Sequence, residues 1–265
     1  MFSRYRSCLG VIAFLVASIS ASAQSPLRVC ADPDDLPFSN ASRAGFDNKI
    51  AEVLGRDLQR PIVFVWARAR RGFLREQFNN NACDVVMDVP EGMKHVHTTI
   101  PYYRSSYVFV ARRSDHLHLT HFDDPAIGRQ RIGLQILEED FSPPSLPLIR
   151  SGHAAQFVGF DPFGASGGDI VRAVADKRVG FSVVWGPLAG YYAARQHVPL
   201  NLSPVEPPVD SSGIPFSFAM TIAVHSNDTK LANDLNAAIQ RNRDSIRAML
   251  KMYHVPLIAK NGGSL

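Results

Sequence analysis

The sequence lacks a strong charge imbalance, a short internal repeat and, beyond its N-terminal region, any long apolar run. No later stretch approaches the ~20 apolar residues that a membrane-spanning helix needs, so no span is expected in the mature chain. Lysine and arginine number 28 against 24 acids, and so small an excess does not indicate a nucleic-acid or membrane partner. The 265 residues are 46% hydrophobic, which is enough to bury one large core or two moderate ones.

The first 23 residues have the organisation of a secretory signal peptide. Arg4 and Arg6 form a positive n-region, residues 9–17 form a short apolar run, and residues 21–23 (ASA) supply the small side chains of a cleavage site. We therefore expect residues 1–23 to be removed and the mature protein to be exported. The mature chain keeps 26 of its 28 basic residues against 24 acids, a net charge of about +2.

Cysteine is scarce as well. Cys8 lies in the predicted signal peptide, which leaves Cys30 and Cys83 as a pair in an oxidising compartment. We expect them to be joined, although a disulfide needs Cα atoms roughly 4.4–6.8 Å apart. A register offset between two neighbouring parallel strands would forbid the bond, so the geometry stays open at this point.

The segment from Leu27 to Phe38 (LRVCADPDDLPF) organises the first part of the chain. A short alternating strand ends in a small residue, an acid and a proline, as a parallel strand does where it delivers a ligand-facing loop. Apolar residues then recur at helical spacing from Phe46 to Leu58, with Asp47 on the polar face. A strand over 62–66, a helix over 71–78 and a strand over 84–87 complete a βαβαβ pattern, which is typical of a parallel sheet covered by helices.

The next segments predict a second α/β unit. A strand over 105–111 has no helix after it, and the polar run that follows is expected to cross out of the first lobe. Further elements are expected as strands over 131–135 and 180–185 and helices over 168–177 and 187–196. The segment 141–150, which contains three prolines, is expected to be irregular.

A final strand over 218–224 returns to the first unit. An amphipathic helical region over 227–253, broken near Asn242, follows it. The second unit is therefore expected to be inserted in the first. We predict a signal peptide at 1–23, a first lobe from 24–112 and 218–265, and an inserted second lobe from 113–217.

Six motifs carry a resemblance to a known family. They read CADPDDLPFSN, GFDNKIAEVLGRDL, ARRGF, CDVVMDVP, TTIPYYRSSYVFV and GFSVVWGPLAGYYA, in this order. Together they resemble the MxaJ/XoxJ family, within the type II periplasmic solute-binding fold, over nearly the whole mature chain. The resemblance implies a periplasmic α/β protein with two lobes, each a mainly parallel sheet flanked by helices, and two crossover hinge strands.

The polar groups of amino-acid-binding relatives are absent. Such proteins resemble one another in an arginine about nine residues before a Pro-Tyr-Tyr motif, and Gly92 stands there in this sequence. A Ser-Gly-Thr-Thr-like turn is replaced by residues 136–138 (ILE), and the aspartate that pairs with the ammonium is replaced at Trp185 and Gly186. Unpaired charges in a cleft cost several kcal/mol. The sequence therefore argues against an amino-acid ligand.

We instead expect an aromatic-walled groove for a larger flat ligand or a segment of a partner protein. In an extended backbone Tyr102 and Tyr103 alternate sides, so one is expected to face the cleft and the other the core. The predicted ligand or partner residues are Asp32, Pro33, Leu36, Phe38, Arg70, Arg71, Phe73, Asp88, Pro90, Tyr102, Tyr103 and Trp185.

Three local clusters have simpler interpretations than a catalytic or metal site. The acids of Asp32 to Asp35 fit a turn better than a calcium loop. The histidines at 95–97 and 116–121 lack zinc-site spacing, so no metal is expected. The arginines of segment 68–75 are either a contact for a carboxylate or acidic partner or a solvated helix start, and the sequence does not choose.

The resemblance implies an accessory protein of a pyrroloquinoline-quinone methanol dehydrogenase. It would bind the dehydrogenase or its immature form, alone or with its cytochrome c, and assist maturation or activation. It is not expected to be an enzyme or to hold a cofactor of its own. One alternative is the solute-binding component of an ABC importer for a small aromatic or organic acid. Another is a dehydratase-like enzyme acting through Asp32 or Asp88. A small molecule, a peptide segment or nothing could occupy the cleft.

Overall fold

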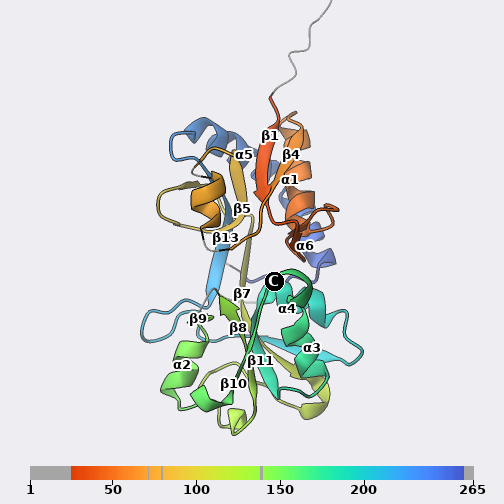
Figure 1. Ribbon diagram of the computed structural model, residues 1–265, viewed down its shortest axis with the longest axis vertical. Coiled ribbons are helices and arrows are strands. Elements are labelled where there is room, and N and C mark those ends of the chain that lie inside the picture. Colours follow the sequence, from red (N-terminus) through yellow and green to blue (C-terminus); the bar gives the residue numbers. More distant parts are fainter. Residues whose placement is uncertain (1–24, 71, 79, 138–139, 260–265) are drawn as a thin grey trace, which may run out of the picture.

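The computed structural model describes residues 25–70, 72–78, 80–137 and 140–259, so the predicted signal peptide lies outside the described residues. Two α/β lobes are stacked end to end and joined by long strands (Figure 1). We name them the N-terminal lobe, which contains β1 to β6 with α1, α5 and α6, and the inserted lobe, which contains β8 to β12 with α2 to α4. This confirms the predicted α/β class.

The sheet of the N-terminal lobe has the strand order β4-β1-β5-β13. Its strands are β1 (Leu27–Ala31), β4 (Ile62–Trp66), β5 (Val85–Pro90) and β13 (Ser217–Val224), with the short β6 (His97–Thr98) paired to β13. Both neighbours of β1 run parallel to it, while β13 is antiparallel to β5. A small hairpin of β2 (Asp34–Asp35) and β3 (Ser39–Asn40) follows β1 and lies toward the other lobe.

Helices cover the two faces of this sheet. One face packs against α1 (Phe46–Asp57), α5 (Thr229–Arg241) and α6 (Arg243–Met252), and the break between α5 and α6 falls at Asn242 as predicted. The other face packs against the short π-helix η1 (Leu74–Phe78). The helix expected over 71–78 is therefore shorter than predicted, because Gly72 has a φ of 90°, outside the helical region.

The disulfide lies within the N-terminal lobe. Cys30 on β1 is bonded to Cys83, with their Cα atoms 5.5 Å apart. The register problem does not arise because Cys83 precedes β5. A bend at Asp84, whose carboxylate holds the Arg28 guanidinium at 2.6 Å, brings the cysteine back beside β1.

The inserted lobe has the strand order β10-β8-β11-β7, with β12 on the other side of part of β7. Its strands are β8 (Ile132–Leu137), β9 (Asp140–Phe141), β10 (Phe157–Phe160), β11 (Phe181–Trp185) and β12 (Leu200–Pro204). Its helices are α2 (Ser145–Arg150), α3 (Asp169–Ala175) and α4 (Gly186–Ala193), with 3-10 turns η2 (Arg113–Asp115), η3 (Pro125–Ile127), η4 (Ala154–Gln156) and η5 (Gly164–Ser166). Alternate residues of β7 enter separate apolar cores on the two faces of the sheet.

The expectation that segment 141–150 is irregular is wrong, because its second half forms α2. Pro144 stands immediately before the helix, and Pro147 is its third residue. The first N–H groups of a helix have no acceptor within the helix, so a proline in the first turn removes no hydrogen bond. Three prolines therefore restrict where this helix can begin without preventing it.

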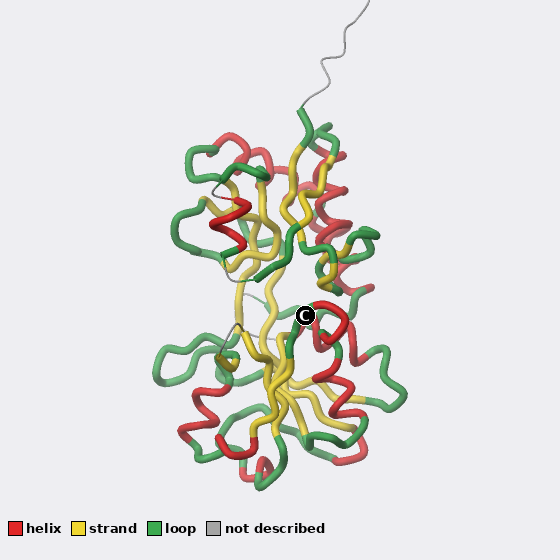
Figure 2. Tube along the Cα trace, in the orientation of Figure 1, coloured by secondary structure: helices red, strands yellow, loops and turns green. Residues whose placement is uncertain are grey.

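Two strands and one tail connect the lobes. The strand β7 (Tyr103–Arg112) pairs with β13 at its beginning and with β11 and β12 further along, so it belongs to both sheets (Figure 2). After α6 the chain returns to β7, where Ser105 Oγ donates to the Pro256 carbonyl and the Ile258 N–H donates to the Arg104 carbonyl. Strand β7 pairs in both sheets, and β13 leads from the inserted lobe back to the N-terminal lobe. The lobe boundaries at residues 112 and 218 therefore stay predictions.

Within the described ranges, which begin at residue 25, none of the helices has both the length and the apolar content needed to cross a bilayer.

Candidate ligand cleft

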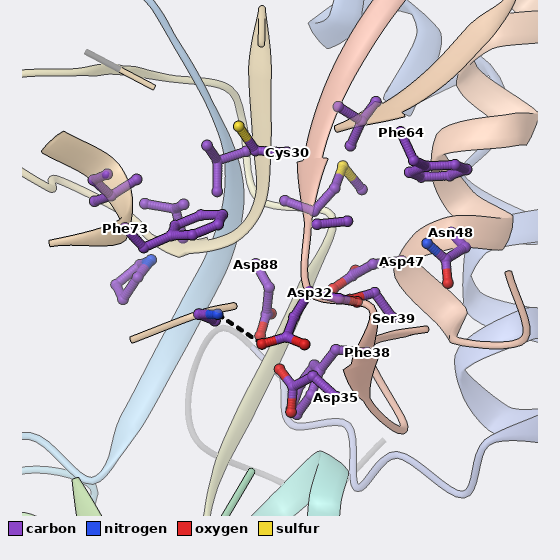
Figure 3. A pocket seen from close by; sticks show the side chains of 18 of the residues that line it. Cys30, Asp32, Asp35, Phe38, Ser39, Asp47, Asn48, Phe64, Phe73 and Asp88 are labelled. Atoms are coloured by element: carbon purple, nitrogen blue, oxygen red, sulfur yellow. Dashed lines mark hydrogen bonds between the residues drawn. The ribbon is translucent and has the colours of Figure 1, made fainter. Parts of the chain in front are cut away.

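Two adjoining cavities lie at the carboxyl ends of β1 and β5, where the sheet topology predicts a ligand. An inter-lobe cavity of about 450 Å³ is lined by Asp35, Phe38, Asp88, Pro90, Tyr107, Gln135, Leu137, Pro143, Pro162, Phe163, Trp185, Leu188, Phe218 and Met220. An inner cavity of about 250 Å³ lies within the N-terminal lobe (Figure 3). Its lining includes Cys30, Asp32, Ser39, Asp47, Asn48, Phe64, Phe73, Met87 and Met93. The two cavities share Asp35, Phe38, Asp88 and Pro90.

Asp32 immediately follows β1 and holds the loops around it. Its Oδ1 accepts the N–H of Asp34 at 2.8 Å, and its Oδ2 accepts the N–H of Ala69 at 2.6 Å, the contact drawn in Figure 3. Both carboxylate oxygens are thus held by backbone donors. The turn interpretation of these acids fits the geometry, and Asp32 borders the inner cavity as part of its frame.

Asp88 occupies an unusual backbone position in β5. Its φ is 57°, in the left-handed region, and the pairing of β5 with β13 shifts register opposite it, between Thr221 and Ala223. A bulge of this kind re-aims one side chain of a strand at a modest cost in strain. It places the Asp88 carboxyl at the junction of the two cavities.

The two tyrosines bind carboxyl groups in place of lining the cleft. Tyr102 Oη donates to Asp47 Oδ1 at 2.7 Å and accepts the Asp88 N–H at 3.0 Å, while Tyr103 Oη donates to Asp88 Oδ1. Both tyrosines are buried, with 8% and 5% exposure, and neither borders either cavity. The expectation that one of them faces the cleft is wrong, because each phenol has a buried acceptor within reach.

Burial and mutual repulsion raise the pKa values of this acid cluster. Burial raises the pKa of Asp35 to about 8, helped by Asp32 and Asp88 and opposed by Arg70. Burial likewise raises the pKa of Asp88 to about 7, although the hydrogen bond from Tyr103 opposes it. The pKa of Asp47 is also raised by burial and by Asp88. Near neutral pH the cluster therefore holds protons that ordinary aspartates would have lost.

Asp47 was expected on the solvated face of its helix, and the structure buries it instead at 5% exposure. The first turn of α1 lies against the sheet, so Phe46 and Asp47 are both inside. The acceptor that Tyr102 requires explains why an acid is tolerated there.

The opposite wall of the inter-lobe cavity is aromatic. The Trp185 ring packs edge-on against Tyr107 at 5.5 Å and Phe218 at 5.7 Å. The backbone N–H of Trp185 donates to Gln135 Oε1 at 2.8 Å. Gln135 is buried, and its hydrogen bond holds the last residue of β11 beside β8. Phe38 contributes a further ring from the N-terminal lobe.

Polar contacts bridge the lobes beside the cavity. Arg70 Nη1 lies 3.7 Å from Asp161 Oδ1 across the cleft, and its guanidinium stacks 4.5 Å from the centre of the Phe163 ring. Tyr192 Oη donates to the Leu36 carbonyl at 3.3 Å. The structure therefore has its lobes in direct contact on this side.

The remaining predicted site residues divide into three groups. Phe73 and Pro90 line cavities, whereas Pro33 and Leu36 lie in the half-buried loop before β3 and line neither. Arg71 lies outside the described residues. Among the residues that the structure describes, no group of three or more His, Cys, Asp or Glu side chains is arranged to hold a metal ion.

Sequence reasoning missed several residues of the cleft, namely Asp35, Asp47, Asn48, Tyr107, Gln135, Phe163 and Phe218. A weak signal existed for Phe163, since it stands between a proline and a glycine in a loop, and loops often carry binding residues. Asp47 and Gln135 had no such signal, because their partners Tyr102 and Trp185 are distant in sequence.

The comparisons with known proteins agree with this architecture. The model of bacterial extracellular solute-binding proteins, family 3, matches residues 27–254. The chain belongs to this family. A curated relative, MoxJ of Paracoccus denitrificans, is 26% identical over 266 residues, covering 94% of this chain and 95% of the relative.

Two solved structures place the chain within the MxaJ/XoxJ group of this family. MxaJ from Methlophaga aminisulfidivorans MPT has a TM-score of 0.78 at 28% identity, covering 88% of this chain and 100% of that one. The periplasmic binding protein XoxJ from Methylobacterium extorquens AM1 has a TM-score of 0.73 at 31% identity, with the same two coverages. The fold is the type II periplasmic binding fold that the motifs predicted.

Proposed function

We propose that this protein is a periplasmic accessory protein of a PQQ-dependent methanol dehydrogenase. It binds the dehydrogenase or its immature form and assists maturation or activation. The motifs of the MxaJ/XoxJ group and the similarity to MoxJ, MxaJ and XoxJ over most of the chain support this role.

The single observation that favours an accessory role over amino-acid import is the chemistry of the cavities. Among the described residues that line them, none is lysine, arginine or histidine, so nothing there can clamp an α-carboxylate. Gly92, in the position of the usual arginine, has a φ of 80° and lies outside both linings. The polar groups at the junction are carboxyls, which would repel a carboxylate wherever they are ionised.

Affinity purification from the periplasm of the source cell tests the partnership. We expect tagged protein to co-purify the dehydrogenase, and deletion of the gene to lower methanol-dependent dye reduction by periplasmic extracts. Complementation with the full chain should restore that activity. A version that lacks residues 1–23 should not, because it would stay inside the cell.

Two results would reject the proposal. One is a tagged protein that brings down no dehydrogenase under conditions where the dehydrogenase is abundant. The other is a deletion strain whose extracts oxidise methanol at the wild-type rate with normal cofactor occupancy.

The inter-lobe cavity itself favours a second candidate, a solute-binding component for a small non-amino-acid ligand. Its volume of about 450 Å³ falls within the usual range for small-molecule sites. An aromatic compound suits its walls, whereas an organic acid finds no cation among the described lining residues. A dehydratase-like role would rest on Asp88, because both oxygens of Asp32 are already held.

A further inference from the structure

The two adjoining cavities form one chamber with unlike ends. The inter-lobe end is walled by rings, including Trp185, Tyr107 and Phe218. The inner end is bordered by carboxyls, and Asp35 and Asp88 stand where the two ends meet. A ligand that spans the junction would therefore touch an apolar surface and an acidic one at the same time.

The electrostatics of the junction favour a positive group. Asp35 is surrounded by Asp32, Asp34 and Asp88, and Arg70 is the cation that opposes them. Arg70 is itself engaged with Asp161 and Phe163 on the other lobe. A bound cation would take the place of the protons that these carboxyls hold near neutral pH, because it relieves the repulsion among ionised carboxyls that are sheltered from water.

The aromatic end suits the same ligand. Ammonium groups and the polarised CH groups beside them are attracted to the faces of Trp, Tyr and Phe. The chamber already holds one example, since the Arg70 guanidinium stacks on the Phe163 ring that lines the inter-lobe end.

A buried amide in the inner cavity gives an independent indication of a ligand. Asn48 is 0% exposed, and its Nδ2 has no hydrogen-bond partner. Its Oδ1 accepts the N–H groups of Asn40 at 3.0 Å and Gly45 at 3.3 Å, which fixes the orientation of the amide. A buried donor without a partner is costly, so the inner cavity must hold an acceptor beside it. An ammonium group has no acceptor, so a water held beside the ligand supplies it.

We propose that the chamber binds a small aryl-alkylammonium compound without a carboxylate, with its ammonium group between Asp35 and Asp88 and its ring against Trp185. The proposal does not depend on the dehydrogenase partnership. Binding to the purified protein tests it separately, so either proposal can fail alone.

Isothermal titration with three matched probes is the direct test. Phenethylammonium, 2-phenylethanol and phenylacetate share one ring and chain length and differ in charge. We expect phenethylammonium to bind at least tenfold more tightly than 2-phenylethanol, and phenylacetate to give no measurable binding. Equal binding of the three probes, tighter binding of phenylacetate, or no binding of phenethylammonium would overturn the proposal.

Variants locate the binding. Asp35→Asn and Asp88→Asn should each weaken phenethylammonium about tenfold or more and leave 2-phenylethanol unchanged. Trp185→Leu should weaken both probes. Asp34→Asn is the matched control, because this exposed acid of the same turn lines neither cavity, and it should change affinity less than about twofold.

An effect of Asp34→Asn as large as that of Asp35→Asn would mean that the probe responds to surface charge only, and the proposal would fail. Because Asp88 also binds Tyr103, its variant is first checked by circular dichroism. Should Asp88→Asn not fold, Asp35→Asn alone decides the outcome.

Discussion

The two lobes share an α/β architecture and differ in what holds them together. The N-terminal lobe contains the disulfide and the buried acids Asp32 and Asp47. In the described part of the inserted lobe, the buried polar side chains include no carboxylate, and one of the two cores contains the rings Phe109, Phe122 and Phe181. One lobe therefore supplies the polar chemistry of the cleft, and the other supplies an apolar wall.

The largest expected effect tests the apolar lobe. Phe181→Ala removes a ring with 0% exposure and should lower the free energy of unfolding by about 3–5 kcal/mol, from lost burial plus the cavity. Urea denaturation followed by circular dichroism measures it. The decrease in unfolding free energy that Phe181→Ala causes should be the same with and without reductant, because the disulfide lies in the other lobe. Phe141→Ala, at 37% exposure on the same lobe, is the control and should cost far less. Similar losses would contradict an apolar core centred on Phe181.

The second effect belongs to the N-terminal lobe. Replacing Cys30 and Cys83 by serine should lower the free energy of unfolding by about 2–4 kcal/mol, because the open chain gains conformational freedom in the unfolded state. The two tryptophans separate the lobes, since Trp66 ends β4 and Trp185 ends β11. In a Trp185→Phe version the remaining Trp66 reports unfolding of the N-terminal lobe. In a Trp66→Phe version the remaining Trp185 reports unfolding of the inserted lobe.

Earlier loss of the Trp66 signal in the serine variant would support independent stabilisation of the two lobes. A shift of equal size at both tryptophans would show instead that the lobes unfold as one cooperative unit. The difference between the two lobes would then concern their local structure and not separate stabilities.

The smallest effect is a dependence on pH. The pKa values of Asp35 and Asp88 are raised to about 8 and about 7, so the folded state holds more protons than the unfolded state above pH 4. Stability should therefore fall as pH rises from about 4 to about 8 and then level off. We expect Tm to be lower at pH 9 than at pH 5.

The double variant Asp35→Asn/Asp88→Asn should reduce this slope and leave the part that Asp47 contributes. Asp57 and Asp115 have lowered pKa values, so they contribute only below about pH 4 and leave this window unaffected. A slope as steep in the double variant as in the wild type would place the titrating groups elsewhere, and scanning calorimetry across buffers of matched ionic strength would reveal it.

Local periodicity predicted the main elements well. Apolar spacing predicted strand β1, helix α1 and the break at Asn242, each to within a few residues of its observed position. The order of elements along the chain is what led us to expect an inserted lobe. The helix α2 escaped prediction, because proline forbids an interior helical position and permits a first-turn one, and the sequence alone does not say where a helix begins.

The candidate site was less accessible to sequence reasoning. Asp47 looks like any surface acid until Tyr102, 55 positions later, is placed against it. The alternation of Tyr102 and Tyr103 was argued from an extended strand, but acceptors on two separate elements decide where the phenols point. Long-range hydrogen bonds of this kind leave no periodic pattern in the chain.

The tail that returns to β7 has a practical consequence for every experiment proposed above. Gly190 on α4 lies so close to the His254 carbonyl that a Cβ atom would stand 1.9 Å from the oxygen, and Ser105 and Arg104 bind the tail on the strand side. A purification tag appended after residue 259 would thus sit where the lobes meet. The start of β1, at the far end of the N-terminal lobe, is the better place to attach one (Figure 1).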